Sequence, residues 1–315
     1  MLLILLAFVA CTQQEWAEPS DEVTVTFSIT PEQAFGTRAM PDGDQEKEQV
    51  NRLVCAVYDI KGNLLEEFGD KESGQIVIED FSAERGVSLP FHLVRGQEYK
   101  VAFWASCSDC EAYDTSDLSK VTIDYTKMSC NDSKCDAFCK TEAFTVSGNE
   151  TKTVVLRRPF AQINVGISQS DYKALAESGK EIASSAITLG PVASILNVVD
   201  NSVSPATDNI ITEVAFKEAA IPDGSFSVQM INDDGETTDA IYKYLALCYL
   251  LVADKNEGTS TYSSELDILQ VTLSHEGRSG VLTLTDGDTK IPVSRNWSTN
   301  IFLTKDILNE ATTNK

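Results

Sequence analysis

The clearest hydrophobic pattern in the chain is a strict alternation close to its amino terminus. Residues 22–30 read EVTVTFSIT, a period of two that is typical of a strand with one buried face. The apolar face carries Val23, Val25, Phe27 and Ile29. β-Branched residues, which favour extended backbone, occupy much of both faces. Because the polar segment 41–49 separates it from the next apolar run, the pattern predicts a strong first strand set apart from the rest of its domain.

Short strands separated by turn residues continue as far as residue 156. They are predicted at residues 53–60, 64–68, 75–79, 87–94, 98–105, 141–146 and 151–156. The sequences KGN at 61–63 and SGNE at 147–150 have the composition of hairpin turns. Strands of this length and spacing, with no long helical period between them, are typical of an antiparallel β-sandwich.

The pattern changes in the middle of the chain. Residues 153–156 (TVVL) are nearly contiguous in apolar character, as in a strand buried on both faces, whereas residues 160–167 (FAQINVGI) alternate. Pro159 cannot donate to a sheet ladder, and it biases Arg158 away from helical backbone. One strand is therefore predicted to end at Arg158 and another to begin at Phe160, as the joint of two β domains packed end to end. A bulge on an edge strand of one large sandwich is the alternative.

The second half adds one short helix to a further set of strands. Ser170 is predicted to cap the helix, with Asp171 in its first turn and Gly179 at its end. Strands are predicted at residues 186–189, 195–199, 214–216, 226–230, 242–252, 266–273 and 281–285. The expected fold class is all-β, with two antiparallel β-sandwich domains in tandem, residues 39–158 and 159–315.

The amino terminus has the features of a lipoprotein signal. Residues 2–10 form an apolar run that has the length of a signal h-region and is too short to span a bilayer. The run ends in FVAC, where small residues directly before Cys11 resemble the lipobox of bacterial lipoproteins. Residues 1–11 are therefore predicted to be a signal segment with lipid on Cys11, followed by a polar tether over residues 12–21. An ordinary cleaved signal with an incidental cysteine is the alternative.

Five cysteines gather in an insertion, residues 105–140, where the strand pattern stops. They are Cys107, Cys110, Cys130, Cys135 and Cys139. Three interpretations are open: local disulfides that hold together a loop without a core, reduced and shielded thiols, or a zinc site that uses the Cys107 and Cys110 pair. The sequence does not predict which cysteines pair. Cys55 and Cys248 lie on apolar strand patterns and are expected to be buried thiols.

Charge and composition exclude several functions. The net charge of −23 argues against nucleic-acid binding, which needs a basic surface to follow phosphates. The chain has only two histidines, and it has no Gly-x-Ser-x-Gly, His-Glu-x-x-His or phosphate-binding glycine loop. Ser170 and Lys173 match Ser-x-x-Lys, but no Lys-Thr-Gly strand accompanies them. We therefore expect no catalytic residues, no metal and no cofactor, and we do not expect an enzyme.

Several segments, taken together, resemble one protein family. They are TRA at 37–39, VYD at 57–59, FWA at 103–105, DAF at 136–138, RRPFAQINVG at 157–166 and RNWSTNI at 295–301. In this order they resemble the fimbrillin-like lipoproteins, the type V pilins and Mfa-like proteins of anaerobic Gram-negative bacteria. The resemblance covers nearly the whole chain. It implies two transthyretin-like β-sandwich domains, lipidation (palmitate) at Cys11, export through the periplasm and a location in the outer membrane at the cell surface.

The resemblance also implies a mechanism of assembly. In pilus-forming members an arginine-specific protease removes the first strand, and a strand from a neighbouring subunit fills the groove that it leaves. Residues 12–38 would then be the tether and the removable strand, with cleavage between Arg38 and Ala39. The implied function is a structural or accessory fimbrial subunit with a role in adhesion. Its partners would be other fimbrial subunits, copies of itself included, and outer-membrane lipid.

Two departures from the family pattern leave the position within a fimbria open. The cysteine insertion is one, and residues 304–310, which read as a short helix where relatives continue into a strand, are the other. Shaft, tip, anchor and accessory roles are therefore all compatible with the sequence. A non-polymerising module that binds a surface glycan or protein is the alternative function. It would use exposed aromatic residues such as Trp104, Tyr113 or Trp297, although we expect the tryptophans to pack in the core.

Overall fold

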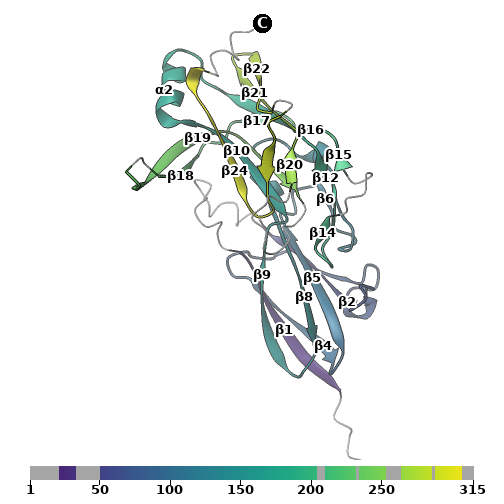
Figure 1. Cartoon of the computed structure of the whole chain (residues 1–315). Helices are drawn as coiled ribbons and strands as arrows, with labels where there is room; N and C mark the ends of the chain where they lie inside the picture. The colour runs from purple at the N-terminus through teal and green to yellow at the C-terminus, as the bar shows by residue number, and fades with distance from the viewer. Residues whose placement is uncertain are drawn as a thin grey trace, which may run out of the picture.

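The computed structural model describes residues 21–32, 50–203, 210–231, 234–252, 264–285 and 288–306. These residues form an elongated molecule in which two β-sandwiches are stacked end to end, with β9 leading into β10 at a waist between them (Figure 1). The predicted all-β class is confirmed. Within the described ranges, no helix is both long enough and apolar enough to cross a bilayer.

The first sandwich packs a three-stranded sheet against a four-stranded sheet. The first sheet has the order β4-β1-β9, with strands at Val87–Val94, Glu22–Pro31 and Glu150–Leu156. The second has the order β3-β2-β5-β8, with strands at Gln75–Ile78, Arg52–Asp59, Glu98–Ser106 and Ala137–Thr145. The facing side chains form one apolar core. Phe27 lies at its centre, with the ring centroids of three other phenylalanines 5.5, 5.6 and 5.7 Å away.

The second sandwich is larger. Its first sheet has the order β15-β12-β19-β10-β24, and β18 also pairs with β19. These strands are Ile210–Ile211, Val192–Ala193, Thr237–Leu251, Phe160–Ser168, Ser298–Leu303 and Ser225–Ile231. Its second sheet has the order β16-β11-β21-β22, and β17 also pairs with β11. These strands are Val214–Ala215, Ser184–Gly190, Ile268–His275, Arg278–Thr283 and Ala219–Ala220. A short pair, β20 (Ser264–Leu266) with β23 (Ile291–Val293), completes it.

The cysteine insertion is not a loop without a core, as one interpretation of the sequence held. A four-stranded sheet of order β14-β13-β7-β6 joins it to the second half of the chain. These strands are Ser202–Val203, Ile195–Asn197, Val121–Ile123 and Tyr113–Asp114. Two 3-10 turns, η2 (Tyr125–Lys127) and η3 (Ser133–Cys135), follow β7. The division at residue 158 therefore stays a prediction, because this sheet contains strands from both sides of it.

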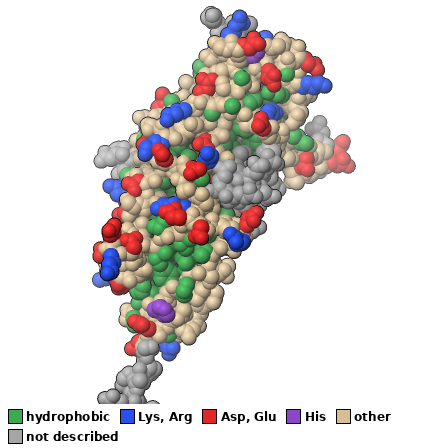
Figure 2. Space-filling view, turned by 180° about the vertical axis from the view of Figure 1, so that it is seen from behind, with side chains coloured by type: hydrophobic (Ala, Val, Ile, Leu, Met, Phe, Trp, Pro, Cys, Tyr) green, Lys and Arg blue, Asp and Glu red, His purple; other side chains and the backbone are tan. Residues whose placement is uncertain are grey.

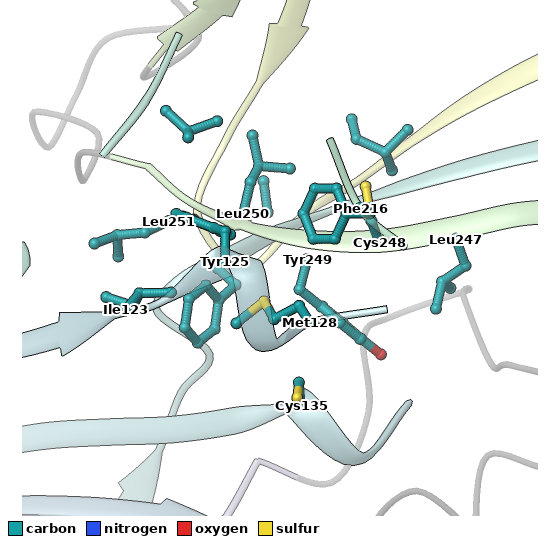
Figure 3. Close-up of a cluster of buried hydrophobic side chains, with 14 of the residues drawn as sticks. Ile123, Tyr125, Met128, Cys135, Phe216, Leu247, Cys248, Tyr249, Leu250 and Leu251 are labelled. Carbon is teal, nitrogen blue, oxygen red and sulfur yellow. The ribbon is translucent and has the colours of Figure 1, made fainter. Parts of the chain in front are cut away.

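A buried tyrosine connects the insertion to the second sandwich. Tyr125 lies on η2 with its ring close to Met128 and below β19 (Figure 3). Its hydroxyl donates to the carbonyl oxygen of Ala193 at 2.8 Å and accepts from the backbone N–H of Leu251 at 2.9 Å. The ring also meets that of Phe216 edge to face, with centroids 5.9 Å apart. Since a buried hydroxyl needs partners, this two-way bond fixes the insertion against β12 and β19.

Helix α2 (Gln169–Glu177) follows β10 directly, and its cap differs from the prediction. The hydroxyl of Ser168, not that of Ser170, accepts from the backbone N–H of Asp171 at 3.1 Å. The hydroxyl of Ser170 instead shares a hydrogen bond with that of Ser168 at 3.0 Å. Gly179 lies just beyond the helix with a φ of +73°, which suits glycine at a helix end as predicted.

Two strand assignments made from the sequence are wrong. Residues 147–150 do not close a hairpin, because β8 and β9 belong to opposite sheets and β9 pairs with β1 in parallel. Residues 64–68 are not a strand. Leu64 makes a single bridge to Tyr58, and the 3-10 turn η1 (Glu66–Phe68) follows. Turn composition therefore located the bends correctly but did not show which sheet the next strand would join.

The burial of the two strands at the waist is the reverse of the prediction. β9 alternates, and Val155 on its outer side is 39% exposed. β10 is buried along both faces from Phe160 to Ile167. Two of its polar side chains bond to β24: Gln162 accepts from the Ser298 hydroxyl at 3.2 Å, and the Asn164 amide donates to Asn300 at 2.9 Å. The break between the two strands does fall around Pro159, as predicted.

On the rear of the molecule, hydrophobic side chains gather over the first sandwich while acidic and basic ones are scattered over both (Figure 2). The partly buried hydrophobic residues that pack on the first core are Leu65, Phe68, Ile76, Ile78, Val87, Leu89 and Phe144. The apolar core of the larger sandwich takes in the insertion as well.

Candidate functional site

Strand β1 is the middle strand of its sheet and fills a groove in the first sandwich. Val25, Phe27 and Ile29 have no exposed surface, and Val23 is 6% exposed. The threonine and serine side chains on the opposite face are half-buried. The strand pairs with β4 in antiparallel register and with β9 in parallel register along most of its length. Both neighbours lie at the edges of the sheet, so among the described residues β1 is the only strand that pairs with either of them in this sheet.

Removing β1 would open a groove suited to another strand. Burying four apolar side chains at about 1.5–3 kcal/mol each contributes roughly 6–12 kcal/mol. This is an upper bound because unfolded chains already bury part of their apolar surface. The empty groove would expose this surface together with the edges of β4 and β9, and open edges pair readily with an added strand. The sequence EVTVTFSIT thus specifies what the groove accepts: an extended segment with apolar residues at alternate positions.

The end of β1 passes close to Gly86, which the sequence analysis did not identify. A Cβ atom at Gly86 would lie 2.5 Å from the carbonyl oxygen of Ile29 and 2.7 Å from Cγ2 of Thr30. The φ angle of Gly86 is +65°, a left-handed conformation that favours glycine. The one signal in the sequence is its position directly before the predicted strand at 87–94. Only glycine combines this turn with so close an approach of β1.

The carboxyl end of β1 is held at the waist. The backbone N–H of Glu32 donates to the carbonyl oxygen of Leu156 at 2.7 Å. The Glu32 carboxylate accepts from the side-chain amide of Asn296 at 2.9 Å and lies 3.7 Å from Nε of Arg157. The point at which β1 leaves its groove is therefore tied to the joint and to the turn before β24.

The predicted processing sites lie outside the described residues. Arg38 and Ala39 follow Glu32 by six and seven positions in the sequence, and Cys11 precedes Asp21 by ten. Lipidation and cleavage at these positions therefore stay predictions. The structure does describe both flanks of the intervening strand, from Asp21, whose carbonyl oxygen accepts from the backbone of Arg95 at 2.8 Å, to Glu32.

Two of the insertion's cysteines form a disulfide. Cys110 and Cys135 are bonded, with Cα atoms 5.3 Å apart and a separation of 25 positions in the sequence. The hydroxyl of Tyr113 donates to the carbonyl oxygen of Cys135. Cys107 and Cys130 are buried thiols, and Cys139 is buried on β8. The disulfide interpretation therefore holds for one pair in the insertion.

The other thiols are shielded from solvent. Burial raises the pKa of the thiols of Cys55, Cys130 and Cys248 above the ordinary cysteine value. A thiol whose pKa is raised is a poor nucleophile because the reactive thiolate is rare. Within the described part of the chain, no three His, Cys, Asp or Glu side chains are grouped so as to hold a metal ion.

A buried ion pair joins the insertion to the start of the second sandwich. Nε of Arg158 donates to both carboxylate oxygens of Asp136 at 2.8 and 2.7 Å, and NH2 lies 2.6 Å from one of them. The guanidinium also lies 4.4 Å from the centre of the Phe138 ring. Burial raises the pKa of the Asp136 carboxyl, and the Arg158 charge opposes that rise. The motifs RRPF and DAF, far apart in sequence, thus meet at the waist.

A cleft of about 1000 Å³ opens beside this ion pair. Its walls come from β5, β8, the joint between β9 and β10, the segment after β13 and the turn before β24. Its charged lining residues are Lys100, Lys140, Arg157, Arg158, Arg295 and Asp200. Five of these six are basic in a chain whose net charge is −23. Sequence reasoning missed this grouping because its members are spread from residue 100 to residue 295.

The aromatic residues proposed as ligand contacts have different environments. Trp104 is fully buried, as expected, and its indole N–H donates to the Ser106 hydroxyl at 3.2 Å. Tyr113 is half-buried and stacks on Phe160 with centroids 5.6 Å apart. Trp297 is 57% exposed and lines the cleft, so the expectation that it packs in the core is wrong.

Comparisons with known proteins give a family and a set of similar folds. The model of a family described as being of unknown function (DUF6562) matches residues 17–313. No curated protein matches the chain. One similar solved structure is that of a candidate adhesin from Bacteroides thetaiotaomicron VPI-5482. It has a TM-score of 0.48 and 12% sequence identity, covering 92% of this chain and 94% of that one.

Two further solved structures are similar over most of their length. A candidate cell adhesion protein from Bacteroides fragilis NCTC 9343 has a TM-score of 0.39 and 14% identity, covering 90% of this chain and 92% of that one. The fimbrial anchor protein Mfa2 from Porphyromonas gingivalis has a TM-score of 0.39 and 12% identity, covering 84% of this chain and 83% of that one.

Proposed function

The chain belongs to the family of unknown function DUF6562, and we propose that it is a cell-surface lipoprotein that acts as a structural or accessory subunit of a fimbria. Lipid on Cys11 anchors it in the outer membrane. Assembly proceeds by donor-strand exchange that a protease starts by cutting between Arg38 and Ala39. The assembled fimbria serves in adhesion, and the partners are other fimbrial subunits or further copies of this chain.

The position of β1 is the observation that carries the proposal. A middle strand whose apolar face is fully buried would ordinarily be a fixed part of its sandwich. Here it stands next to a segment that contains Arg38, the one basic residue between Met1 and Lys47. While the chain is intact, the tether keeps β1 at a high effective concentration beside its groove. Once the chain is cut, β1 is a separate peptide and loses the high effective concentration that the tether gave it. A strand from another subunit then competes with β1 for the groove.

Protease treatment of the intact protein tests the proposal. Brief exposure to an arginine-specific protease, which leaves Lys47 uncut, should cut after Arg38, remove β1 from part of the molecules and give species larger than a monomer by size-exclusion chromatography. Arg38→Gln should prevent both effects. Arg85→Gln, which changes an exposed arginine elsewhere in the first sandwich, is the matched control and should prevent neither. A cut protein that stays monomeric even when other fimbrial subunits of the same cell are added would contradict strand exchange.

The lipid anchor is tested separately. Expression in a bacterium supplied with labelled palmitate should label the wild type and leave Cys11→Ala unlabelled. Cys55→Ala changes a buried thiol and should leave labelling intact. Equal labelling of the wild type and Cys11→Ala would show that the lipid, if any, is attached elsewhere.

A second candidate function is a surface-binding module that does not polymerise. The observation in its favour is the cleft at the waist, where Trp297 is exposed among basic side chains. A protein that fails the strand-exchange test but binds a surface glycan through this cleft would fit this function. The two functions are also compatible within one molecule, because β1 and the cleft are separate features.

A further inference from the structure

The cleft at the waist has the opposite charge from the rest of the protein. The chain carries 25 Lys and Arg against 48 Asp and Glu, yet the charged lining of the cleft is five basic residues and one acidic residue. Charges more than about 8 Å apart in physiological salt are largely screened, so a ligand inside the cleft senses its lining more than the distant acidic surface. A negatively charged ligand is the kind that this cleft favours.

The basic side chains of the lining are not equivalent. Arg158 is neutralised by Asp136, and Lys140 lies 2.6 Å from a carboxylate oxygen of Glu142. The side chain of Arg157 is 70% exposed, and its ion pair with Glu32 is long, at 3.7 Å. In the described ranges, Lys100 has no carboxylate oxygen within 4.0 Å, the limit for an ion pair. Arg157 and Lys100 are therefore the charges best placed for a ligand.

Arg295 donates hydrogen bonds to the oxygen atoms of two residues, Val252 and Asn201. Its Nε and NH2 donate to the carbonyl oxygen of Val252 at 3.2 and 3.1 Å. Its NH1 donates to the side-chain and main-chain oxygens of Asn201. A guanidinium positioned in this way keeps its charge and loses little freedom when a ligand arrives, so it contributes a fixed positive potential to the cleft.

The turn before β24 presents the indole of Trp297 on the wall of the cleft. The backbone N–H of Trp297 donates to the carbonyl oxygen of Ser294 at 3.1 Å, and its carbonyl oxygen accepts from Gln162 at 2.9 Å. Asn296, which precedes Trp297, has a φ of +57°. Its backbone N–H donates to the carbonyl oxygen of Phe160 at 2.8 Å. These bonds fix the backbone, so the 57% exposure of Trp297 is a property of the turn and not of a loose side chain.

A buried hydroxyl lines the same cleft without a partner. Ser294 is 5% exposed, and its Oγ makes no hydrogen bond within the described residues. A buried polar group that lacks a partner is unfavourable, and an incoming hydroxyl group can satisfy it. Ser294 is adjacent to Arg295 and is the acceptor for the turn that holds Trp297. The aromatic face, the fixed charge and the unpaired hydroxyl therefore lie on one short segment.

We propose that this cleft binds an acidic sugar, a pyranose that carries a carboxylate, as part of a glycan chain. The apolar C–H face of the ring packs on the indole of Trp297, whose face is electron-rich. The carboxylate binds Arg157 and Lys100, since guanidinium and carboxylate form strong charge-assisted hydrogen bonds. The positive charge of Arg295 adds to the attraction. A sugar hydroxyl pairs with Ser294. The volume of about 1000 Å³ is at the upper end of small-molecule sites and leaves room for neighbouring sugars.

Calorimetric titration of the full chain tests this, with Arg38→Gln as the background so that strand exchange does not intervene. The acidic probes are trigalacturonic acid and 3′-sialyllactose, which separate a hexuronate from a sialic acid. The matched neutral probes are maltotriose and lactose. At least one acidic probe should bind at millimolar concentration or below, more weakly as salt rises, and the neutral probes should not bind.

Variants separate the cleft from the general surface. Trp297→Ala should weaken binding about tenfold, the loss expected for one aromatic contact. Arg157→Gln and Ser294→Ala should each weaken it several-fold. The matched controls are Phe302→Ala, an exposed aromatic on β24, and Arg278→Gln, an exposed arginine on β22; both should bind like the background. Circular dichroism confirms that each variant is folded.

Three results would overturn the proposal. One is that neither acidic probe binds. Another is that the neutral probes bind as well as the acidic ones. The third is that a glutamate hexapeptide binds as tightly as the sugar and Trp297→Ala leaves both unchanged, which would indicate a site for acidic peptides. None of these results bears on the cleavage of Arg38, so failure here leaves the proposed strand exchange standing.

Discussion

The two sandwiches are built around middle strands with the same pairing and different burial. β1 has an antiparallel neighbour, β4, on one side and a parallel neighbour, β9, on the other. β10 likewise has an antiparallel neighbour, β19, and a parallel neighbour, β24. β1 is buried on one face only, whereas β10 is buried on both. The same arrangement of strands therefore surrounds two middle strands that differ in burial.

The contacts of β10 hold it firmly within the second sandwich. Its outer face is covered, and at Gly166 a Cβ atom would lie 2.5 Å from the ring of Phe226. Its polar side chains bond to β24, and it continues without a break into α2. The outer face of β1 is instead threonine and serine, and these side chains are half-buried. The difference in burial makes β1, rather than β10, the strand to which the proposed exchange applies.

The largest expected effect comes from placing a charge on the outer face of each strand. Asn164→Asp on the outer face of β10 should cost more than about 4 kcal/mol, because a carboxylate would be buried there and the hydrogen bond that the Asn164 amide donates to Asn300 would be lost. Thr26→Asp on β1 should cost less than about 1 kcal/mol, since its side chain is half-buried at the surface. Urea unfolding of both variants checks the prediction. Similar losses for the two variants would remove the distinction between the strands.

The next effect concerns the ion pair that joins the sandwiches. Asp136→Ala should lower the free energy of unfolding by about 3–5 kcal/mol, because it leaves Arg158 buried without its counter-charge. Glu177→Ala removes the exposed partner of Lys173 on α2 and should cost no more than about 0.5 kcal/mol. Thermal and urea unfolding measure both. A small loss for Asp136→Ala would mean that water reaches the pair and that the waist is open.

The smallest effect is local to the end of β1. Gly86→Ala should destabilise the first sandwich by about 1–3 kcal/mol, because the added Cβ meets Ile29 and φ is positive. Gly62→Ala also has a positive φ but nothing within 4 Å, so it should cost less. Hydrogen exchange of β1 amides should rise in Gly86→Ala alone. Equal exchange in the two variants would show that the close approach at Gly86 does not hold β1.

Local pattern was sufficient to predict β1 and insufficient to predict β10. In β1 the polar face meets solvent, so the alternation in sequence is also an alternation in burial. In β10 the polar residues Gln162 and Asn164 are buried because Ser298 and Asn300, more than 130 residues later, bond to them. A short window of sequence contains no trace of such partners. For the same reason the turn at 147–150 was located, but the sheet that β9 joins was not.

The waist was the least predictable part of the molecule. Its motifs were recognised one at a time, including the segments that contain Asp136, Arg158 and Trp297. That they face one another depends on the insertion crossing to the second sandwich through Tyr125 and β7, a contact between distant parts of the chain. The disulfide between Cys110 and Cys135 could not be chosen from five candidates for the same reason. Tertiary structure, not local sequence, creates the cleft.

The exchange of β1 itself is the measurement that tests the account most directly. The protein is cut with an arginine-specific protease and incubated with an excess of isotope-labelled peptide of the sequence Glu22–Pro31. Native mass spectrometry then records the mass of the complex. The account predicts that labelled peptide replaces β1 in the cut protein, while uncut Arg38→Gln protein takes up none. Cut protein that keeps its original strand, or uncut protein that takes up as much label, would contradict the claim that cleavage makes β1 exchangeable.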